Sequence, residues 1–153
     1  MGQPPLEIRV VGAREAALLE NVVDDVFDHP VRSELLRAFL ASPDNVLVVA
    51  RIEGQVVGMA SGLAYVHPDK ELSLFINEVG VSARFQGRGV GRMLLDRILI
   101  WGRERGCVEA WVATEVGNEA ARRLYESAGG AQDDECSVVY VYSLADPSSE
   151  SGP

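Results

Sequence analysis

Three glycines at alternate positions are the residues of this sequence best suited to hold a charged ligand. Gly87, Gly89 and Gly91 stand between a strand-like and a helix-like segment, with Arg88 and Arg92 among them. Glycine lets the backbone approach a ligand closely, and the free N–H groups at a helix start favour negative charge. Two arginines one helical turn apart can add charge to the same anion. The pattern predicts a pyrophosphate site; the alternative is a glycine-rich connection without a ligand.

Two common phosphate-binding patterns do not fit this loop. A Walker loop needs lysine and then serine or threonine after its last glycine, whereas Gly91 is followed by Arg92 and Met93. A dinucleotide fingerprint starting at Gly89 needs a third glycine where the chain has Leu94. The loop therefore requires another explanation.

The loop resembles the acetyl-CoA loop of the GNAT superfamily of N-acetyltransferases. That loop has the pattern Gln/Arg-x-x-Gly-x-Gly/Ala, and residues 86–91 (Gln-Gly-Arg-Gly-Val-Gly) match it at every fixed position. A second family feature is an Asn that opens a helix with a Tyr seven residues later, and Asn118 and Tyr125 match it. The resemblance extends over most of the chain, from the first expected strand to the last.

The resemblance implies that acetyl-CoA is the cosubstrate and that no metal is needed. Loop N–H groups would bind the pyrophosphate, and the pantetheine arm would pair with an open strand edge. It also implies that Tyr125 protonates the departing thiolate, and the alternative for Tyr125 is a core aromatic. The alternative for Asn118 is a simple helix N-cap, and for Val79 and Val81 it is a place in the core of the sheet. The cofactor-binding residues expected on this basis are Val79, Gly80, Val81, Gln86, Gly87, Arg88, Gly89, Val90, Gly91, Arg92, Asn118 and Tyr125.

A carboxylate beside the acetyl group would complete the chemistry. An aliphatic amine is mostly protonated at neutral pH and must lose a proton before it attacks. Glu78 directly precedes the expected cofactor edge, in an otherwise apolar strand, and is the candidate general base, acting directly or through a water. The alternative is an edge or solvent-facing residue. His29 and His67 each adjoin a proline and are expected at the surface.

Within the superfamily, the chain resembles the aminoglycoside 3-N-acetyltransferase group most. The likeness lies in residues 24–27, 65–68, 78–81 and 120–125. An aminoglycoside is a polycation, so Asp24, Asp28 and Glu78 are the predicted acceptor-binding residues. Polyamines, amino acids and protein N-termini are alternative acceptors. A non-catalytic acyl-CoA-binding regulatory module is the alternative function.

The elements that must position these residues follow from the spacing of apolar side chains. Strands are predicted at 6–11, 46–52, 55–66, 71–81, 108–114 and 137–144. Helices are predicted at 13–27, 31–41, 90–104 and 118–128. With the resemblance, this order predicts an α/β fold: a single GNAT-type domain whose central mixed, largely antiparallel twisted sheet is flanked by about four helices. The domain is expected over 1–146 and a disordered acidic tail over 147–153.

Composition and charge narrow the remaining possibilities. The chain has 153 residues, 47% of them apolar, which suits one domain. Its net charge of −9 argues against nucleic-acid and anionic-membrane partners, although six arginines against two acids lie between Arg84 and Arg105. Cys107 and Cys136 have no metal-ligand or disulfide-framework spacing. No signal peptide or spanning segment is apparent, so a cytoplasmic protein is expected; the resemblance leaves a homodimer open, because homodimers are common in this family.

Overall fold

A single twisted sheet organises the chain in the computed structural model, which describes residues 2–150. The five strands lie in the order β1-β2-β3-β4-β5, antiparallel except that β5 runs parallel to β4. The strand bounds are Leu6–Val10 (β1), Asn45–Ile52 (β2), Gln55–His67 (β3), Lys70–Val81 (β4) and Glu109–Val112 (β5). The α-helices of the described residues are Ser33–Ala41 (α1), Val90–Arg105 (α2) and Glu119–Ser127 (α3).

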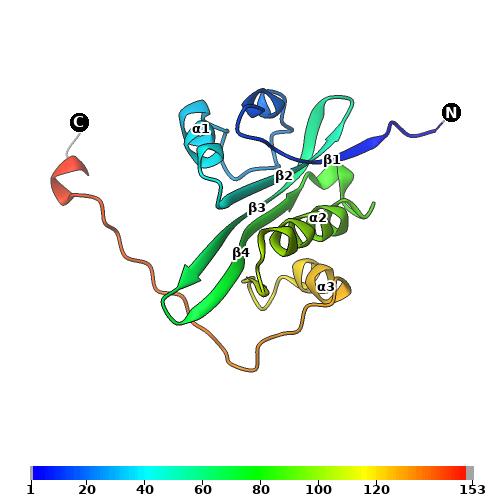
Figure 1. The fold of residues 1–153 in the computed structure, drawn as a ribbon. Helices are drawn as coiled ribbons and strands as arrows, with labels where there is room; N and C mark the ends of the chain where they lie inside the picture. Colours follow the sequence, from blue (N-terminus) through cyan, green and yellow to red (C-terminus); the bar gives the residue numbers. More distant parts are fainter. Residues whose placement is uncertain (1, 151–153) are drawn as a thin grey trace.

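Helices cover both faces of the sheet, and each covered face holds an apolar core. Figure 1 shows α2 and α3 on one side, with α1 and the 3-10 turn η1 (Ala16–Leu19) on the other. Leu94 and Ile98 of α2 pack with Val48, Leu74 and Ile76 on the first face. On the second face the buried core is formed by Val11, Leu19, Val26, Leu40, Leu47, Val49, Val56 and Met59. The predicted α/β architecture is therefore confirmed, with three α-helices among the described residues instead of about four.

The missing helix is the one expected at 13–27. Within this range only Ala16–Leu19 form a helical turn, a 3-10 helix, and the chain then pairs with β3. Val23 N–H donates to the Val56 carbonyl (3.0 Å), and Val56 N–H donates to the Asn21 carbonyl (2.8 Å). Val22 and Val23 are β-branched and lose rotamer freedom in a helix, so pairing with the first residues of β3 outweighs their helical propensity.

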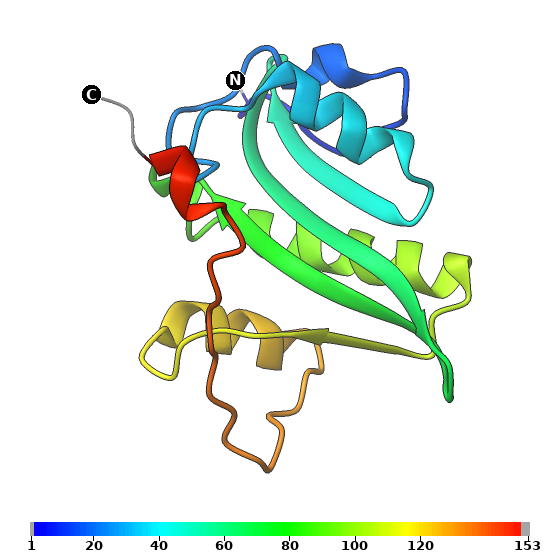
Figure 2. The same cartoon turned by 90° about the vertical axis from the view of Figure 1, so that its left-hand side faces the viewer.

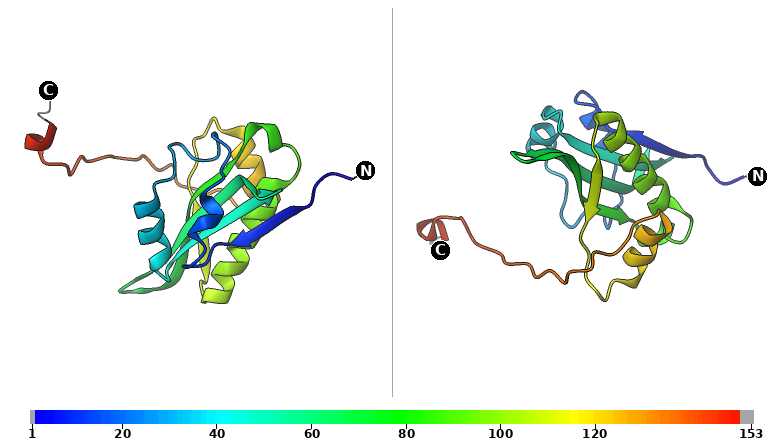
Figure 3. Two further views of the ribbon diagram at one scale, coloured as in Figure 1. Left: turned by 90° about the horizontal axis from the view of Figure 1, so that it is seen from above. Right: turned by 60° about the horizontal axis from the view of Figure 1, so that its bottom comes forward.

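The prediction of a last strand at 137–144 is also wrong. These residues form no strand, and all of them are exposed to solvent. Figures 1 and 3 show the segment after α3 running away from the sheet. A strand needs a partner for its backbone groups, and alternating apolar residues do not by themselves provide one.

A short turn is the last element that the structure describes. Pro147–Glu150 form a 3-10 turn (η3), whereas residues 151–153, the rest of the predicted tail, lie outside the described residues. The boundary at 146 stays a prediction. None of the described helices combines the length and apolar character that crossing a membrane requires.

Candidate active site

The glycine loop opens directly into the first turn of α2. Gly87 and Gly89 have left-handed φ angles of 75° and 80°, and a Cβ built on either would meet no heavy atom within 4 Å. Gly89 is the N-cap of α2, and no side chain caps that helix end. The first-turn N–H groups have no acceptor within the helix, and the helix dipole adds partial positive charge. The loop therefore presents unobstructed donors to an anion.

Arginines flank the loop in two different ways. The guanidinium carbons of Arg84 and Arg88 lie 5.5 and 5.3 Å from the ring centroid of Phe85, which holds positive charge beside the loop. Arg92 instead donates from Nε to Asp96 Oδ1 (2.9 Å) and from Nη1 to the Ser127 carbonyl (2.6 Å). Its side chain thus ties α2 to the end of α3, and its backbone belongs to the first turn of α2.

The edge of β4 next to the loop is open. β4 pairs with β5 only from Ser73↔Glu109 to Ile76↔Val112, although β4 itself continues to Val81. Figure 2 shows β4 and β5 close together at one end and diverging toward the other. This divergence leaves the edge at 77–81 without a strand partner among the described residues, which gives the open strand edge that the resemblance implied. Gln86 Nε2 donates to the Val81 carbonyl (3.0 Å) and holds the loop against the end of that strand.

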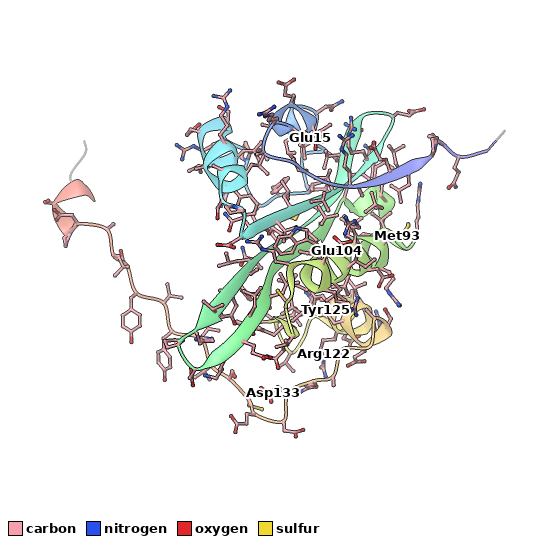
Figure 4. All side chains as sticks on the ribbon, viewed as in Figure 1. Glu15, Met93, Glu104, Arg122, Tyr125 and Asp133 are labelled. Atoms are coloured by element: carbon pink, nitrogen blue, oxygen red, sulfur yellow. The ribbon has the colours of Figure 1, made fainter. Side chains whose placement is uncertain are left out.

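The loop, the open edge and α3 meet at one point. An ideal Cβ on Gly91 would lie 3.3 Å from Leu124 Cδ2 and 3.7 Å from Val81 Cγ2, so the helices approach closely there. Tyr125, labelled in Figure 4, is half-buried against the same apolar core, and burial raises the pKa of its phenol. The hydroxyl is therefore protonated at neutral pH. Asn118 Oδ1 accepts from the Ala121 N–H (3.1 Å) as the N-cap of α3.

A β-bulge in β4 turns Glu78 to the face that carries α1. The register changes from Gly62↔Ile76 to Ser61↔Glu78, so Asn77 is the extra residue. Ile76 and Val79 both pack in the core beneath α2, whereas Glu78 pairs with Ser61 on the opposite face. Burial raises the pKa of Glu78, and the negative charge of Asp28 raises it further. The sequence did not predict this bulge.

The segment that carries Asp28 crosses β4 in close contact. A Cβ on Gly80 would lie 2.7 Å from the Val26 carbonyl oxygen, so only glycine fits there. Asp25 Oδ2 accepts from the Ala83 N–H (2.9 Å), which lowers the pKa of Asp25 and fixes the segment to the strand end. The structure thus brings Asp28 to Glu78, while Asp24 lies exposed on the same segment.

Three aromatic residues line the same face of the sheet as Glu78. Ser61, Leu63 and Tyr65 alternate on that face of β3, and the register continues from Leu63 to Phe75 and from Phe75 to Trp111. We call Tyr65, Phe75 and Trp111 the aromatic surface.

Specific contacts hold the aromatic surface together. The rings of Phe75 and Trp111 lie 4.4 Å apart, and Trp111 Nε1 donates to Tyr65 Oη (2.6 Å). Sequence reasoning missed Phe75 and Trp111. The available signal was one aromatic residue in each of two strands expected to be neighbours.

Comparisons with known proteins agree with this geometry. The family model described as "Acetyltransferase (GNAT) family" matches residues 16–130. The N-alpha-acetyltransferase RimI of Mycobacterium tuberculosis is 38% identical over 104 residues, which are 68% of this chain and 63% of that protein. An L-2,4-diaminobutyric acid acetyltransferase of Virgibacillus pantothenticus is 35% identical over 101 residues, 65% and 61% of the two chains. The match thus spans about three fifths of the length of these relatives.

Solved structures share the fold at low sequence identity. An aminoglycoside acetyltransferase from an uncultured soil metagenomic sample, in complex with sisomicin, has a TM-score of 0.75 and 20% identity, covering 92% of this chain and 97% of that one. The aminoglycoside N-acetyltransferase AAC(6')-Iy in complex with CoA has a TM-score of 0.73 and 19% identity, covering 94% and 98%. The family model matches most of the chain, and the glycine loop and the open strand edge agree with that match. The protein therefore belongs to the acetyltransferase (GNAT) family.

Proposed function

We propose that this protein transfers an acetyl group from acetyl-CoA to a primary amine of a cationic small molecule. The observation that carries the proposal is the open edge of β4 directly beside the uncapped N-terminus of α2. Coenzyme A has phosphates that suit the N–H groups of residues 87–91, together with Arg84 and Arg88. Its pantetheine arm carries amides that suit the main chain of Val79–Val81.

Glu78 and Tyr125 supply the two proton transfers. Bound acetyl-CoA would supply an activated acetyl thioester. Glu78 accepts the proton of the attacking amine, and its raised pKa brings it closer to the operating pH that general base catalysis favours. The protonated hydroxyl of Tyr125 donates its proton to the departing thiolate sulfur. Asn118 is proposed as a further cofactor contact, compatible with its role as N-cap.

The face of the sheet that carries Glu78 also suits the acceptor. Trp111 is 44% exposed, and aromatic faces attract both cations and the apolar faces of sugar rings. Glu78 lies on the same face of the sheet as Trp111, and the negative charge of Asp28 acts on it there. A cationic, ring-containing amine such as an aminoglycoside matches both features, and Asp24 is the proposed outer contact.

An aminoglycoside is the first candidate acceptor, and the sequence resemblance implies acetylation at its 3-N position. The similar solved structures include an aminoglycoside 6'-acetyltransferase, and so do not favour the 3-N position. A second candidate is an α-amino group, favoured by the 38% identity to an N-alpha-acetyltransferase, and a diamino acid is a third.

An acceptor panel tests the proposal. Thiol release from acetyl-CoA is measured with aminoglycosides, polyamines, 2,4-diaminobutyrate and short peptides with free N-termini. Release with an aminoglycoside supports the first candidate, and mass spectrometry of the product assigns the nitrogen. Release with peptides or the diamino acid alone moves the acceptor to that class. Acetyl-CoA that stabilises the protein thermally without thiol release from any amine would instead indicate a non-catalytic acyl-CoA-binding module.

A further inference from the structure

Arg92 stands at a position where a helix does not favour an arginine. It lies in the first turn of α2, where the helix dipole already supplies partial positive charge. The first backbone hydrogen bond of α2 runs from the Met93 N–H to the Gly89 carbonyl (3.1 Å), so the Arg92 N–H is one of the donors that the helix leaves free. The sequence suggests that the guanidinium adds its charge to the same anion. The structure shows the guanidinium bound to another helix.

The guanidinium of Arg92 is bound to the end of α3. Its Nη1 donates to the Ser127 carbonyl oxygen (2.6 Å) and to Ser127 Oγ (3.4 Å). Ser127 is the last residue of α3, so its carbonyl has no donor within the helix, and the negative end of the helix dipole favours a cation there. Ser127 Oγ in turn donates to the Leu124 carbonyl (2.6 Å). Asp96 accepts from Arg92 Nε (2.9 Å) and holds the same side chain against α2.

Few other contacts fix the position of α3. The helix has no fully buried residue, and it packs against the core through the partly buried Leu124 and Tyr125. Asn118 caps its start, which is a contact within the helix itself. A helix of nine residues is marginal on its own, so contacts with neighbouring elements decide where it lies. Within the described part of the chain, the side-chain hydrogen bonds between α2 and α3 all come from Arg92.

We propose that Arg92 is a positioning residue for Tyr125. Tyr125 lies two residues before Ser127 in the same helix, and Figure 4 labels it there. The bond from Arg92 to Ser127 therefore sets the position of the Tyr125 hydroxyl relative to the glycine loop, and so relative to the sulfur of a coenzyme A bound at that loop. The backbone of Arg92 serves the anion, while its side chain serves α3. The inference rests on the proposed role of Tyr125 as proton donor.

Steady-state kinetics separates this role from direct cofactor binding. Arg92→Met keeps an unbranched side chain but donates no hydrogen bond, so α3 loses its connection to α2. A displaced proton donor slows the chemical step, and kcat should fall on the order of tenfold while the KM for acetyl-CoA changes by less than about twofold. Arg123→Met is the matched control: Arg123 pairs with Glu119 (3.9 Å) within α3, so its loss should leave kcat unchanged.

A double-mutant cycle tests whether Arg92 acts through Tyr125. In Tyr125→Phe there is no hydroxyl left to position, so adding Arg92→Met should lower kcat by less than about twofold. A full tenfold further loss would overturn the proposal, and so would an unchanged kcat in Arg92→Met alone. A rise only in the KM for acetyl-CoA would instead make the guanidinium a cofactor ligand and overturn it as well. Unchanged kcat in Tyr125→Phe alone would overturn the proton-donor role itself, and this inference with it.

Titration of the Tyr125 phenol gives a second test that needs no acceptor. Nuclear magnetic resonance of protein labelled with ¹³C at tyrosine Cζ follows the titration, and Tyr125→Phe assigns the signal. Burial raises the pKa of Tyr125, so a displaced α3 that exposes the ring should lower this pKa in Arg92→Met and not in Arg123→Met. Loss of a nearby cation would by itself raise the pKa, so the two causes have opposite signs. An unchanged or higher pKa in Arg92→Met would overturn the proposal.

Discussion

The negative charge of Asp28 acts on Glu78 across the face of β4: burial raises the pKa of Glu78, and the charge of Asp28 raises it further. The bulge at Asn77 sets the direction of one side chain, and the close passage of Val26 over Gly80 brings the other. The pair combines a tuned proton acceptor with negative charge for a cationic acceptor.

Removing the charge of Asp28 should move the pH dependence of turnover. In Asp28→Asn, the pKa of Glu78 falls, because one of the two effects that raise it is gone. The acidic limb of the pH profile of kcat/KM should then shift to lower pH. Asp24→Asn is the control: it removes one negative charge from the same segment and should not shift the acidic limb of the pH profile. An unmoved limb in Asp28→Asn would mean that Glu78 does not control it.

Replacing Glu78 itself should separate a base from a binding residue. Glu78→Gln keeps shape and hydrogen bonding but cannot accept a proton, so kcat should fall at neutral pH. The loss should shrink as pH rises, because more of the amine arrives deprotonated. Acetyl-CoA affinity should hardly change. If only the acceptor KM rises and the pH profile keeps its shape, Glu78 binds the acceptor and the base lies elsewhere.

The same variant should be more stable than wild type at neutral pH. The pKa of Glu78 is higher in the folded than in the unfolded protein, so ionised Glu78 disfavours folding. This penalty is full above the folded pKa and disappears as pH falls below the unfolded one. The Tm of Glu78→Gln should exceed that of wild type at pH 7, with the difference vanishing in acid. A lower Tm at pH 7 would show that the carboxylate stabilises the fold.

Tyr125→Phe tests the proton donor. The ring that packs against the core is retained, so Tm should change little, while kcat should fall by on the order of 10²-fold. Steady-state kinetics with an acceptor from the panel measures the loss. Unchanged turnover would assign Tyr125 to packing alone.

Gly89→Ala and Gly106→Ala form a matched pair for the cofactor loop. Both glycines have left-handed φ angles, 80° and 94°, and open space where a Cβ would stand. Each variant should lose about 1 to 2 kcal/mol of stability from the backbone strain. Only Gly89→Ala places a methyl group where the pyrophosphate is expected, so only it should raise the KM for acetyl-CoA. Equal acetyl-CoA affinity in the two variants would argue against the loop assignment.

Much of the fold could be predicted because its signals are local. The helices at 90–105 and 119–127 can be predicted from the spacing of their apolar residues. The glycines at 87 and 89 indicate a turn before the first of these helices, because both have positive φ. The helix expected at 13–27 failed because Val22 and Val23 gain more from pairing with Val56 than from a helical turn. A single-sequence pattern does not contain that distant partner.

By itself, the sequence determined the cofactor motif, the helix it opens, the candidate base and the candidate acid. These depend on residue type and short spacing, which are fixed along the chain. Only the tertiary structure decided that Asn77 bulges and that the charge of Asp28 acts on Glu78. It also decided that Trp111 donates a hydrogen bond to Tyr65 and that residues 137–144 do not join the sheet. Each of these depends on strand register and on contacts between segments distant in sequence, which are set by packing of the whole domain.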